Sequence, residues 1–395
     1  MKIRKARVLG QNEGIAIIVD DDGLPIDRLN YFIMQELRGL ADSTIEQRTR
    51  IVIHIEDWAA ERKLSLEDEM ATTCLSTDTL FQSLVSHLHK KQTPKFADNV
   101  FQFNSEQVGA DYFNQRIDLA KLYFEYLNNK FLSRSRLDNP SIKNNKIFFE
   151  KLINLLSKRK VSGQHVSHVK GLTTLQQSSL FRGLNEGSFF KWNKTTRLRN
   201  KLIVLMLYET GIRKGELLSL TIKNCHTKVS KPYIYVEENV NYPDPRSEIP
   251  QVKTLERVVP ISTKLAELID EYKPIRSQHD EAKKQPPFLF LSSKKPYTPM
   301  TVTAVDAVFV TIKKAIPNIT KLSTHILRHT RFENLDRYMF KHNYPDAQKT
   351  KLKNTLGGWS RNSRTSENYE KQATEEQVFD VITGIQDEID TDIYK

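Results

Sequence analysis

Cysteine is nearly absent from this chain of 395 residues, which contains only Cys74 and Cys225. Two thiols cannot build a disulfide framework or a four-thiolate zinc site, so both are expected to be reduced. Long apolar runs are also missing: the longest, from Leu202 to Tyr208, has seven residues, whereas a membrane span needs about 20. The amino terminus, MKIRKARVLG, has no apolar stretch behind its basic residues. This predicts no secretory signal and a cytoplasmic protein that does not enter the membrane.

Glycine and proline are modest, at 14 and 15 residues, and 38% of the chain is hydrophobic. This composition excludes collagen-like and wholly disordered proteins. At about 150 residues per domain, the length predicts two or three domains.

Acidic residues are scarce in one region of a chain whose net charge is +12. Residues 1–150 hold 20 Lys and Arg against 22 Asp and Glu, whereas the remaining residues hold 40 against 26. Residues 151–201 contain 11 basic residues and a single acid, Glu186. Clustered charge of one sign is favoured when a polyanion lies against it, so nucleic acid is the leading candidate partner. The alternative is a solvated linker.

Hydrophobic periodicity predicts a mostly α fold with a small β-sheet, divided into five segments. Residues 1–25 are expected to form a short appendage, a β-hairpin with strands from Ala6 to Leu9 and from Ile15 to Val19. Apolar residues three and four apart predict a helical domain over residues 26–156. Residues 157–171, SKRKVSGQHVSHVKG, predict an exposed basic linker. Mixed helices and short strands are expected in a domain from 172 to 373, and residues 374–395 predict an acidic amphipathic helix.

Several elements follow from local patterns. A helix is expected from the cap Ser43, with Gln47 behind it, and others at 78–89, 105–127 and 144–157. Short strands are expected in the later domain at 233–238, 252–254 and 257–261, and helices at 173–184, 196–208 and 214–219. The helix at 105–127 carries aromatic residues at helical spacing, which are typical of core packing, although a stacking platform is the alternative: Tyr112, Phe113, Tyr123 and Tyr126.

His165 and His168 lie three residues apart in the linker, a spacing that suits a metal on one helical face. No Cys, Asp or Glu stands nearby to complete a ligand set, so no metal site is predicted there.

Three short motifs place polar residues where chemistry is plausible. In TGIRKGELLSL, Arg213 follows an apolar helix, and Glu216 three residues later is placed to hold a neighbouring guanidinium. A surface ion pair explains this spacing equally well.

In THILRHT, the spacing puts three cationic or titratable groups on one face of a helical turn, namely His325, Arg328 and His329. Such a face offers a fork-shaped donor for a phosphate and two imidazoles that exchange protons. In LGGWSRNSRTSENYEK, Trp359 precedes Tyr369 by ten residues. Nearby cations lower the pKa of a tyrosine, which favours its use as an oxygen nucleophile.

These residues, in this order and on this scale, resemble the tyrosine recombinases, also called the phage integrase family. The resemblance covers residues 172–373 by motif, and residues 26–156 resemble the family's core-binding domain. It implies that Arg213 and Arg328 clamp the scissile phosphate and that Tyr369 attacks it to form a 3′-phosphotyrosyl link. His325 then assists proton transfer, His329 hydrogen-bonds near the phosphate, and Trp359 fills a position where relatives have His or Trp. Glu216 supports this set.

The resemblance also implies a lysine on a β-hairpin that donates a proton to the leaving 5′ oxygen. Lys253, in PQVKTLERVVPIS, matches this position, with Lys231 as the alternative. Because the covalent intermediate conserves the energy of the broken bond, the chemistry implied needs no cofactor, neither ATP nor a metal. Basic residues at the linker are expected to contact the DNA backbone: Lys158, Arg159, Lys160 and Lys170.

The acidic tail carries one apolar stripe and resembles the family's carboxy-terminal segment, which docks on a neighbouring protomer. A homotetramer on double-stranded DNA is therefore expected, with DNA-bending or directionality factors as further candidate partners. Packing of the tail on its own protomer is the alternative.

The sequence thus predicts a site-specific DNA recombinase or integrase of a mobile element. Three rivals are a type IB topoisomerase, which uses similar residues, an inactive DNA-binding regulator with the same fold, and a basic RNA-associated protein. The RNA reading lacks any stacking motif.

Overall fold

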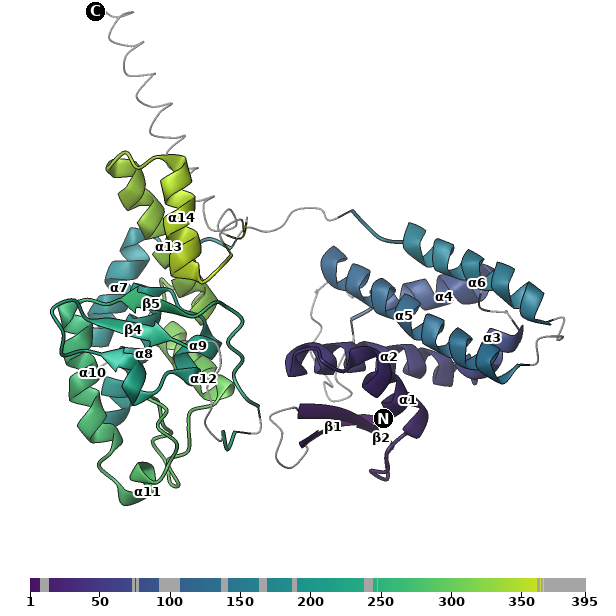
Figure 1. The fold of residues 1–395 in the computed structure, drawn as a ribbon, viewed down its shortest axis with the longest axis horizontal. Helices are drawn as coiled ribbons and strands as arrows, with labels where there is room; N and C mark the ends of the chain where they lie inside the picture. Colours follow the sequence, from purple (N-terminus) through teal and green to yellow (C-terminus); the bar gives the residue numbers. More distant parts are fainter. Residues whose placement is uncertain are drawn as a thin grey trace, which may run out of the picture. The chain divides into compact units, whose positions relative to one another are not determined.

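The fold is described from a computed structural model of the chain (Figure 1). The residues that it describes are 1–7, 14–72, 75, 78–91, 107–135, 141–162, 169–186, 190–237, 244–246, 248–360, 363 and 365. The chain divides into two compact units, Met1–Val166 and Ser167–Lys395. The predicted tail helix, His165 and His168 lie outside the described residues.

The first unit begins with a two-stranded antiparallel hairpin. Strand β1 (Lys2–Arg7) pairs with β2 (Gly14–Val19), with Lys2 opposite Val19 and Arg7 opposite Gly14. The predicted hairpin is confirmed, although its first strand begins at Lys2. Ile18 is fully buried among helical residues, so the hairpin belongs to the core of this unit and is not an appendage.

Helices make up most of the remaining described part of the first unit. They are α1 (Asp27–Phe32), continued by a π-helical turn (Ile33–Leu37), then α2 (Asp42–Glu61), α3 (Leu66–Thr72), α4 (Asp78–His89), α5 (Ala110–Arg134) and α6 (Ser141–Lys158). Tyr123 of α5 is buried and meets Phe32 edge-on, with ring centroids 4.9 Å apart. The aromatic residues of α5 therefore pack in the core, as predicted.

Some helix ends differ from expectation. Helix α4 has the predicted bounds, but α2 begins at Asp42 with Ala41 at its N-cap, so the predicted cap at Ser43 is wrong. The Gln47 amide instead donates to Gln115 Oε1 on α5 at 2.9 Å, a tertiary contact that local pattern does not reveal. Helix α5 begins at Ala110, after Gly109, and α3 is absent from the sequence prediction.

The second unit packs helices around a three-stranded antiparallel sheet of order β3-β4-β5 (Figure 1). Its helices are α7 (Thr174–Glu186), α8 (Lys194–Thr210), α9 (Lys214–Ser219), α10 (Thr263–Arg276), α11 (Asp280–Lys283), α12 (Val302–Ala315), α13 (Thr324–Lys341) and α14 (Asp346–Gly357). The apolar run from Leu202 lies in α8, whose residues 202–204, 206 and 207 are fully buried. Helix α8 is the centre of this core and packs on α10 and α13.

The sheet consists of β3 (Cys225–His226), β4 (Tyr233–Val236) and β5 (Arg257–Pro260), with Val236 opposite Arg257. Two of the predicted strands are confirmed, but the one expected at 252–254 is wrong. That stretch is irregular because its Thr254 hydroxyl turns inward to the Glu216 carboxylate. Helices α10 and α11 are absent from the sequence prediction.

The linker meets the second unit through backbone hydrogen bonds. Helix α6 continues through Lys158, and residues 163–168 are not described. The Gly171 N–H then donates to Glu333 Oε1, and the Leu172 N–H to Thr330 Oγ1, both at 2.8 Å. The chain is thus tied to α13 as soon as it enters this unit. Within the described residues, no helix is both long and apolar enough to cross a membrane.

Candidate active site

Arg213 is positioned by the turn between α8 and α9. Gly211 ends α8 in the left-handed region, with φ +66°, which glycine adopts without strain. Arg213 is then the N-cap of α9, and its side chain remains about one-third exposed (32%). Its Nη1 donates to the backbone oxygen of Gly357 at 3.3 Å. A charged group at the surface is therefore held by its own turn and by a main-chain oxygen 144 residues later.

Glu216 lies beneath Arg213 and is fully buried. It accepts a hydrogen bond from the Arg213 backbone N–H at 2.8 Å, and it accepts bonds from Thr254 and Arg257. Burial alone raises the pKa of a carboxyl group, but the Arg257 charge and these hydrogen bonds hold the pKa of Glu216 below its ordinary value. Glu216 is thus a buried anion that fixes the start of α9.

Arg328 comes from the first turns of α13, whose N-cap Ser323 accepts from the Ile326 N–H at 3.3 Å. Although charged, Arg328 is only 2% exposed. Its guanidinium donates to the backbone oxygens of Gly211 and, at 3.2 Å, Gly357. The two arginines, 115 residues apart in sequence, therefore meet at the single carbonyl of Gly357.

His325 and His329 lie on the same face of α13, as the spacing predicts. Their Nε2 atoms are 3.0 Å apart, and the rings meet edge to face. His329 is buried, whereas His325 is exposed. Burial, His325 and Arg328 lower the pKa of His329 to about 4. Although the His325 side chain reaches solvent, partial burial of its ring, with Arg328 and Arg213 nearby, lowers the pKa of His325. Both rings are therefore neutral at pH 7, and one donates to the other.

The end of α14 supplies a backbone acceptor and an aromatic ring. Gly358 has φ +66°, and a Cβ there would lie 2.4 Å from Nη1 of Arg257. A Cβ on Gly357 would lie 2.5 Å from the Trp359 ring. Trp359 stacks on Phe332, and its ring centroid is 5.0 Å from the Arg328 Cζ. Both glycines are thus required for the end of α14 to lie this close to Arg257 and to the Trp359 ring.

Lys253 is exposed in the irregular stretch before β5, between two fixed points. A Cβ on Gly215 would lie 2.2 Å from the backbone oxygen of Gln251, and Thr254 donates to Glu216. The structure therefore holds the chain on both sides of Lys253 against the start of α9. Lys231 is exposed just before β4.

The other predicted residues lie in the first unit, at the start of the second unit or outside the described part. Tyr369 is not among the described residues. Lys158 ends α6, Lys160 pairs with Asp118 at 2.6 Å, and Arg159 lies over the Phe81 ring. Lys170 is exposed at the start of the second unit.

Sequence reasoning missed Arg257, which is buried and bound to Glu216. Along β5, Arg257 and Val259 face inward while Val258 and Pro260 are exposed. A charged residue at an inward position of an alternating strand is the signal that could have found it.

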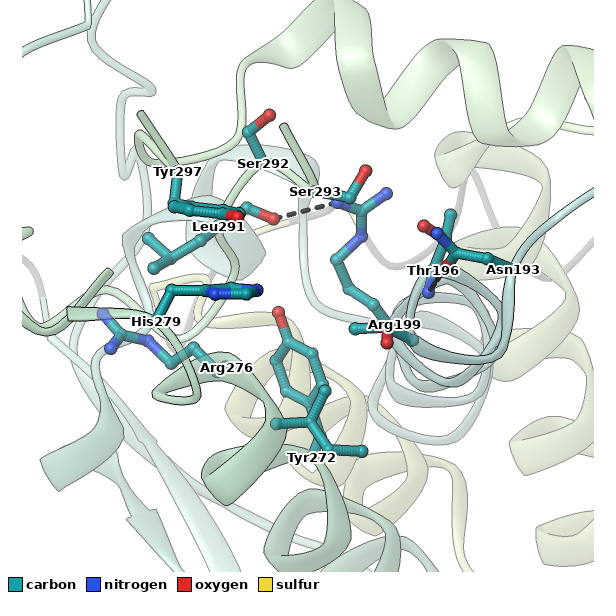
Figure 2. Close-up of a pocket in the computed structure, with 12 residues that line it drawn as sticks. Asn193, Thr196, Arg199, Tyr272, Arg276, His279, Leu291, Ser292, Ser293 and Tyr297 are labelled. Atoms are coloured by element: carbon teal, nitrogen blue, oxygen red, sulfur yellow. Dashed lines mark hydrogen bonds between the residues drawn. The ribbon is translucent and has the colours of Figure 1, made fainter. Parts of the chain in front are cut away.

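Figure 2 shows a pocket of the second unit, of about 130 Å³, which no predicted site residue lines. Arg199 lies in its wall and donates to the backbone oxygen of Leu291 and to Asn200 Oδ1, each at 2.9 Å. This arginine joins α8 to the segment that contains Leu291, so its role is structural.

The cluster as a whole presents two guanidinium groups and two neutral imidazoles, with an aromatic ring beside them. Arginine presents fixed N–H donors that match the oxygens of a carboxylate or phosphate. The arrangement is therefore suited to binding an oxyanion and to moving a proton beside it.

Comparison with known proteins gives a family match over residues 175–376, to the phage integrase family. Among solved structures, the chain is similar to XerA recombinase, with 15% identity, coverage of 90% of this chain and 98% of that one, and a TM-score of 0.39. It is similar to XerH recombinase bound to a palindromic difH substrate, with 16% identity, coverage of 89% of this chain and 87% of that one, and a TM-score of 0.44. It is also similar to the Tn1549 transposon integrase with circular intermediate DNA, with 18% identity, coverage of 66% of this chain and 75% of that one, and a TM-score of 0.39.

No curated protein matches the chain. The family match covers just over half of its residues, and its bounds enclose the whole cluster described above. The chain therefore belongs to the phage integrase family, the tyrosine recombinases.

Proposed function

We propose that this protein is a site-specific DNA recombinase or integrase of a mobile element, which cuts and rejoins strands through a 3′-phosphotyrosyl intermediate. The observation that carries the proposal is the meeting of Arg213 and Arg328 at the Gly357 carbonyl. An oxyanion placed there receives donors from both side chains, and these stabilise the charge that grows on the phosphate oxygens in the transition state.

The reaction is a transesterification. The Tyr369 oxygen forms a bond to phosphorus as the bond from phosphorus to the 5′ oxygen breaks. The phenolic proton passes to the imidazole of His325. The lowered pKa of His325 keeps this ring neutral at pH 7, so that it is free to accept the proton. Lys253 gives a proton to the leaving 5′ oxygen. In the rejoining step, a 5′ hydroxyl attacks the phosphotyrosine, the bond from phosphorus to the tyrosine oxygen breaks, and both proton transfers run in reverse.

Affinity for DNA is expected to come mainly from phosphate contacts. The excess of basic over acidic residues after residue 150 is large, and Lys158, Arg159 and Lys170 are exposed around the linker. Binding should therefore weaken steeply as salt rises. A homotetramer on DNA, joined by residues 374–395, would bring two recombining sites together.

A covalent-trapping assay tests this function. The protein is incubated with nicked suicide substrates from the ends of the element that encodes it, and the adduct is mapped by mass spectrometry. We expect an adduct on Tyr369 that Tyr369→Phe abolishes while DNA binding is retained. Adduct formation by that variant would move the nucleophile to another residue. Tight, salt-sensitive binding by the wild type without any adduct would favour an inactive regulator.

A further inference from the structure

Arg257 lies at the centre of the contacts that join the parts of the cluster. It is 7% exposed and begins β5. Its Nη2 donates to Glu216 Oε2 at 2.9 Å, and its Nη1 donates to Glu216 Oε1 and Thr254 Oγ1, both at 3.2 Å. Its Nε donates to the backbone oxygen of Leu356 at 2.8 Å. One guanidinium thus holds the start of α9, the residue after Lys253 and the end of α14.

The stretch that carries Lys253 depends on this guanidinium. Thr254 follows Lys253 directly, and its hydroxyl is held between Arg257 and Glu216. The Leu255 N–H donates to the Gly358 oxygen at 3.1 Å. Among the described residues the stretch forms no ladder with the sheet, and these contacts hold the backbone on the carboxy-terminal side of Lys253.

A guanidinium is needed because its acceptors lie on different sides. Arginine directs N–H groups from three nitrogens in one plane, whereas a lysine ammonium is a point charge at the end of a flexible stem. A lysine at residue 257 would keep the ion pair with Glu216 but not the simultaneous bonds to Leu356 and Thr254.

We propose that Arg257 is a positioning residue for Lys253, fixing the backbone so that the Lys253 ammonium reaches the leaving 5′ oxygen. This inference rests on the proposed function. In the cleavage step, Lys253 loses a proton and the 5′ oxygen gains it as the bond to phosphorus breaks. A substrate with sulfur in place of the bridging 5′ oxygen leaves as a thiolate, which is far less basic than an alkoxide and needs no proton.

The experiment measures single-turnover cleavage of matched oxygen and 5′-sulfur suicide substrates by the full chain. Arg257→Lys and Arg257→Met should cleave the oxygen substrate about 10²-fold more slowly, the scale of a lost general acid. Both should cleave the sulfur substrate within about 5-fold of the wild type, and Lys253→Ala should show the same pattern. A matched control is Arg276→Lys, because Arg276, which lines the Figure 2 pocket, is equally buried and donates to the backbone oxygens of Phe288 and Pro286. This variant should cleave both substrates like the wild type.

Equal slowing of both substrates by the Arg257 variants would overturn the inference, since it would mean a loss of the whole site. Unchanged cleavage of both would overturn it as well. If Lys253→Ala were not restored by sulfur, Lys253 would not be the acid and the inference would fall while the recombinase function stood. Absence of cleavage by the wild type would instead remove the proposed function itself.

Discussion

Two histidine pairs, one in each unit, have similar titration behaviour and different surroundings. His54 of α2 and His87 of α4 stack with ring centroids 4.0 Å apart, while His325 and His329 of α13 meet at 4.5 Å. Burial is the main cause that lowers the pKa of all four, to about 4 for His54 and for His329. A lowered pKa alone therefore does not identify a functional residue.

The contacts of each pair make the difference. The Nε2 of His54 donates to the His87 backbone oxygen at 2.9 Å, and that of His87 donates to the His54 oxygen at 3.0 Å. These bonds join α2 to α4 and leave the rings closed on each other. On α13 the rings contact each other through Nε2, His325 is exposed, and the nearby Arg213 is about one-third exposed, whereas Arg116, which contacts His54, is buried. We infer that the first pair stabilises its unit and the second acts on a ligand.

The largest effect is expected from removing the charge beside the second pair. Arg328→Ala should lower the rate of covalent adduct formation by roughly 10³-fold, because it removes donors to the transition state. Burst kinetics on a suicide substrate measure this rate, with DNA affinity measured in parallel. A rate near that of the wild type would sink the assignment of Arg328 to the phosphate clamp.

Matched substitutions in the two pairs should separate their roles. His325→Gln should slow cleavage by about 10²-fold, since a glutamine cannot accept the phenolic proton. His87→Gln should leave the cleavage rate of bound protein unchanged. Similar losses in both variants would mean that the comparison between the pairs is mistaken.

The stability of the fold should depend on the first histidine pair more than on the second. His54→Ala should lower the free energy of unfolding of the first unit by about 2 kcal/mol, through lost hydrogen bonds and ring contact. Urea unfolding followed by the fluorescence of the buried Trp58 measures this change. His325→Ala is the control, and it should shift the same transition little.

The smallest expected effect is on the pH dependence of the free energy of unfolding. His54 is neutral when folded down to a pKa of about 4, but in the unfolded chain it gains a proton near pH 6.5. Its contribution is therefore fully present above pH 6.5 and is lost as pH falls toward 4. From pH 7 to about pH 5.5 the first unit should lose about 1 kcal/mol, and His54→Ala should flatten this dependence. An equally steep slope in the variant would exclude His54 as its source.

Local pattern predicted much of the fold and the side chains of the cluster. The bounds of α4 and α9 follow from the sequence because helix periodicity is a short-range property. The three residues of THILRHT share a face because they share a turn. The features that could not be predicted depend on partners far away in the sequence. Thr254 lies outside any strand because its hydroxyl bonds Glu216, 38 residues earlier, and Arg257 pairs with the same carboxylate, 41 residues before it. The Gly357 acceptor is a main-chain atom, which no side-chain motif records.

That acceptor also makes the backbone of α14 a natural sensor. If a bound phosphate draws these N–H groups of Arg213 and Arg328 away, the Gly357 carbonyl loses two hydrogen bonds. The polarisation of its peptide group then changes, and so does the magnetic environment of the Gly358 amide nitrogen. In protein labelled only at glycine, that one resonance would report whether DNA occupies the site, with no dye attached and no residue altered.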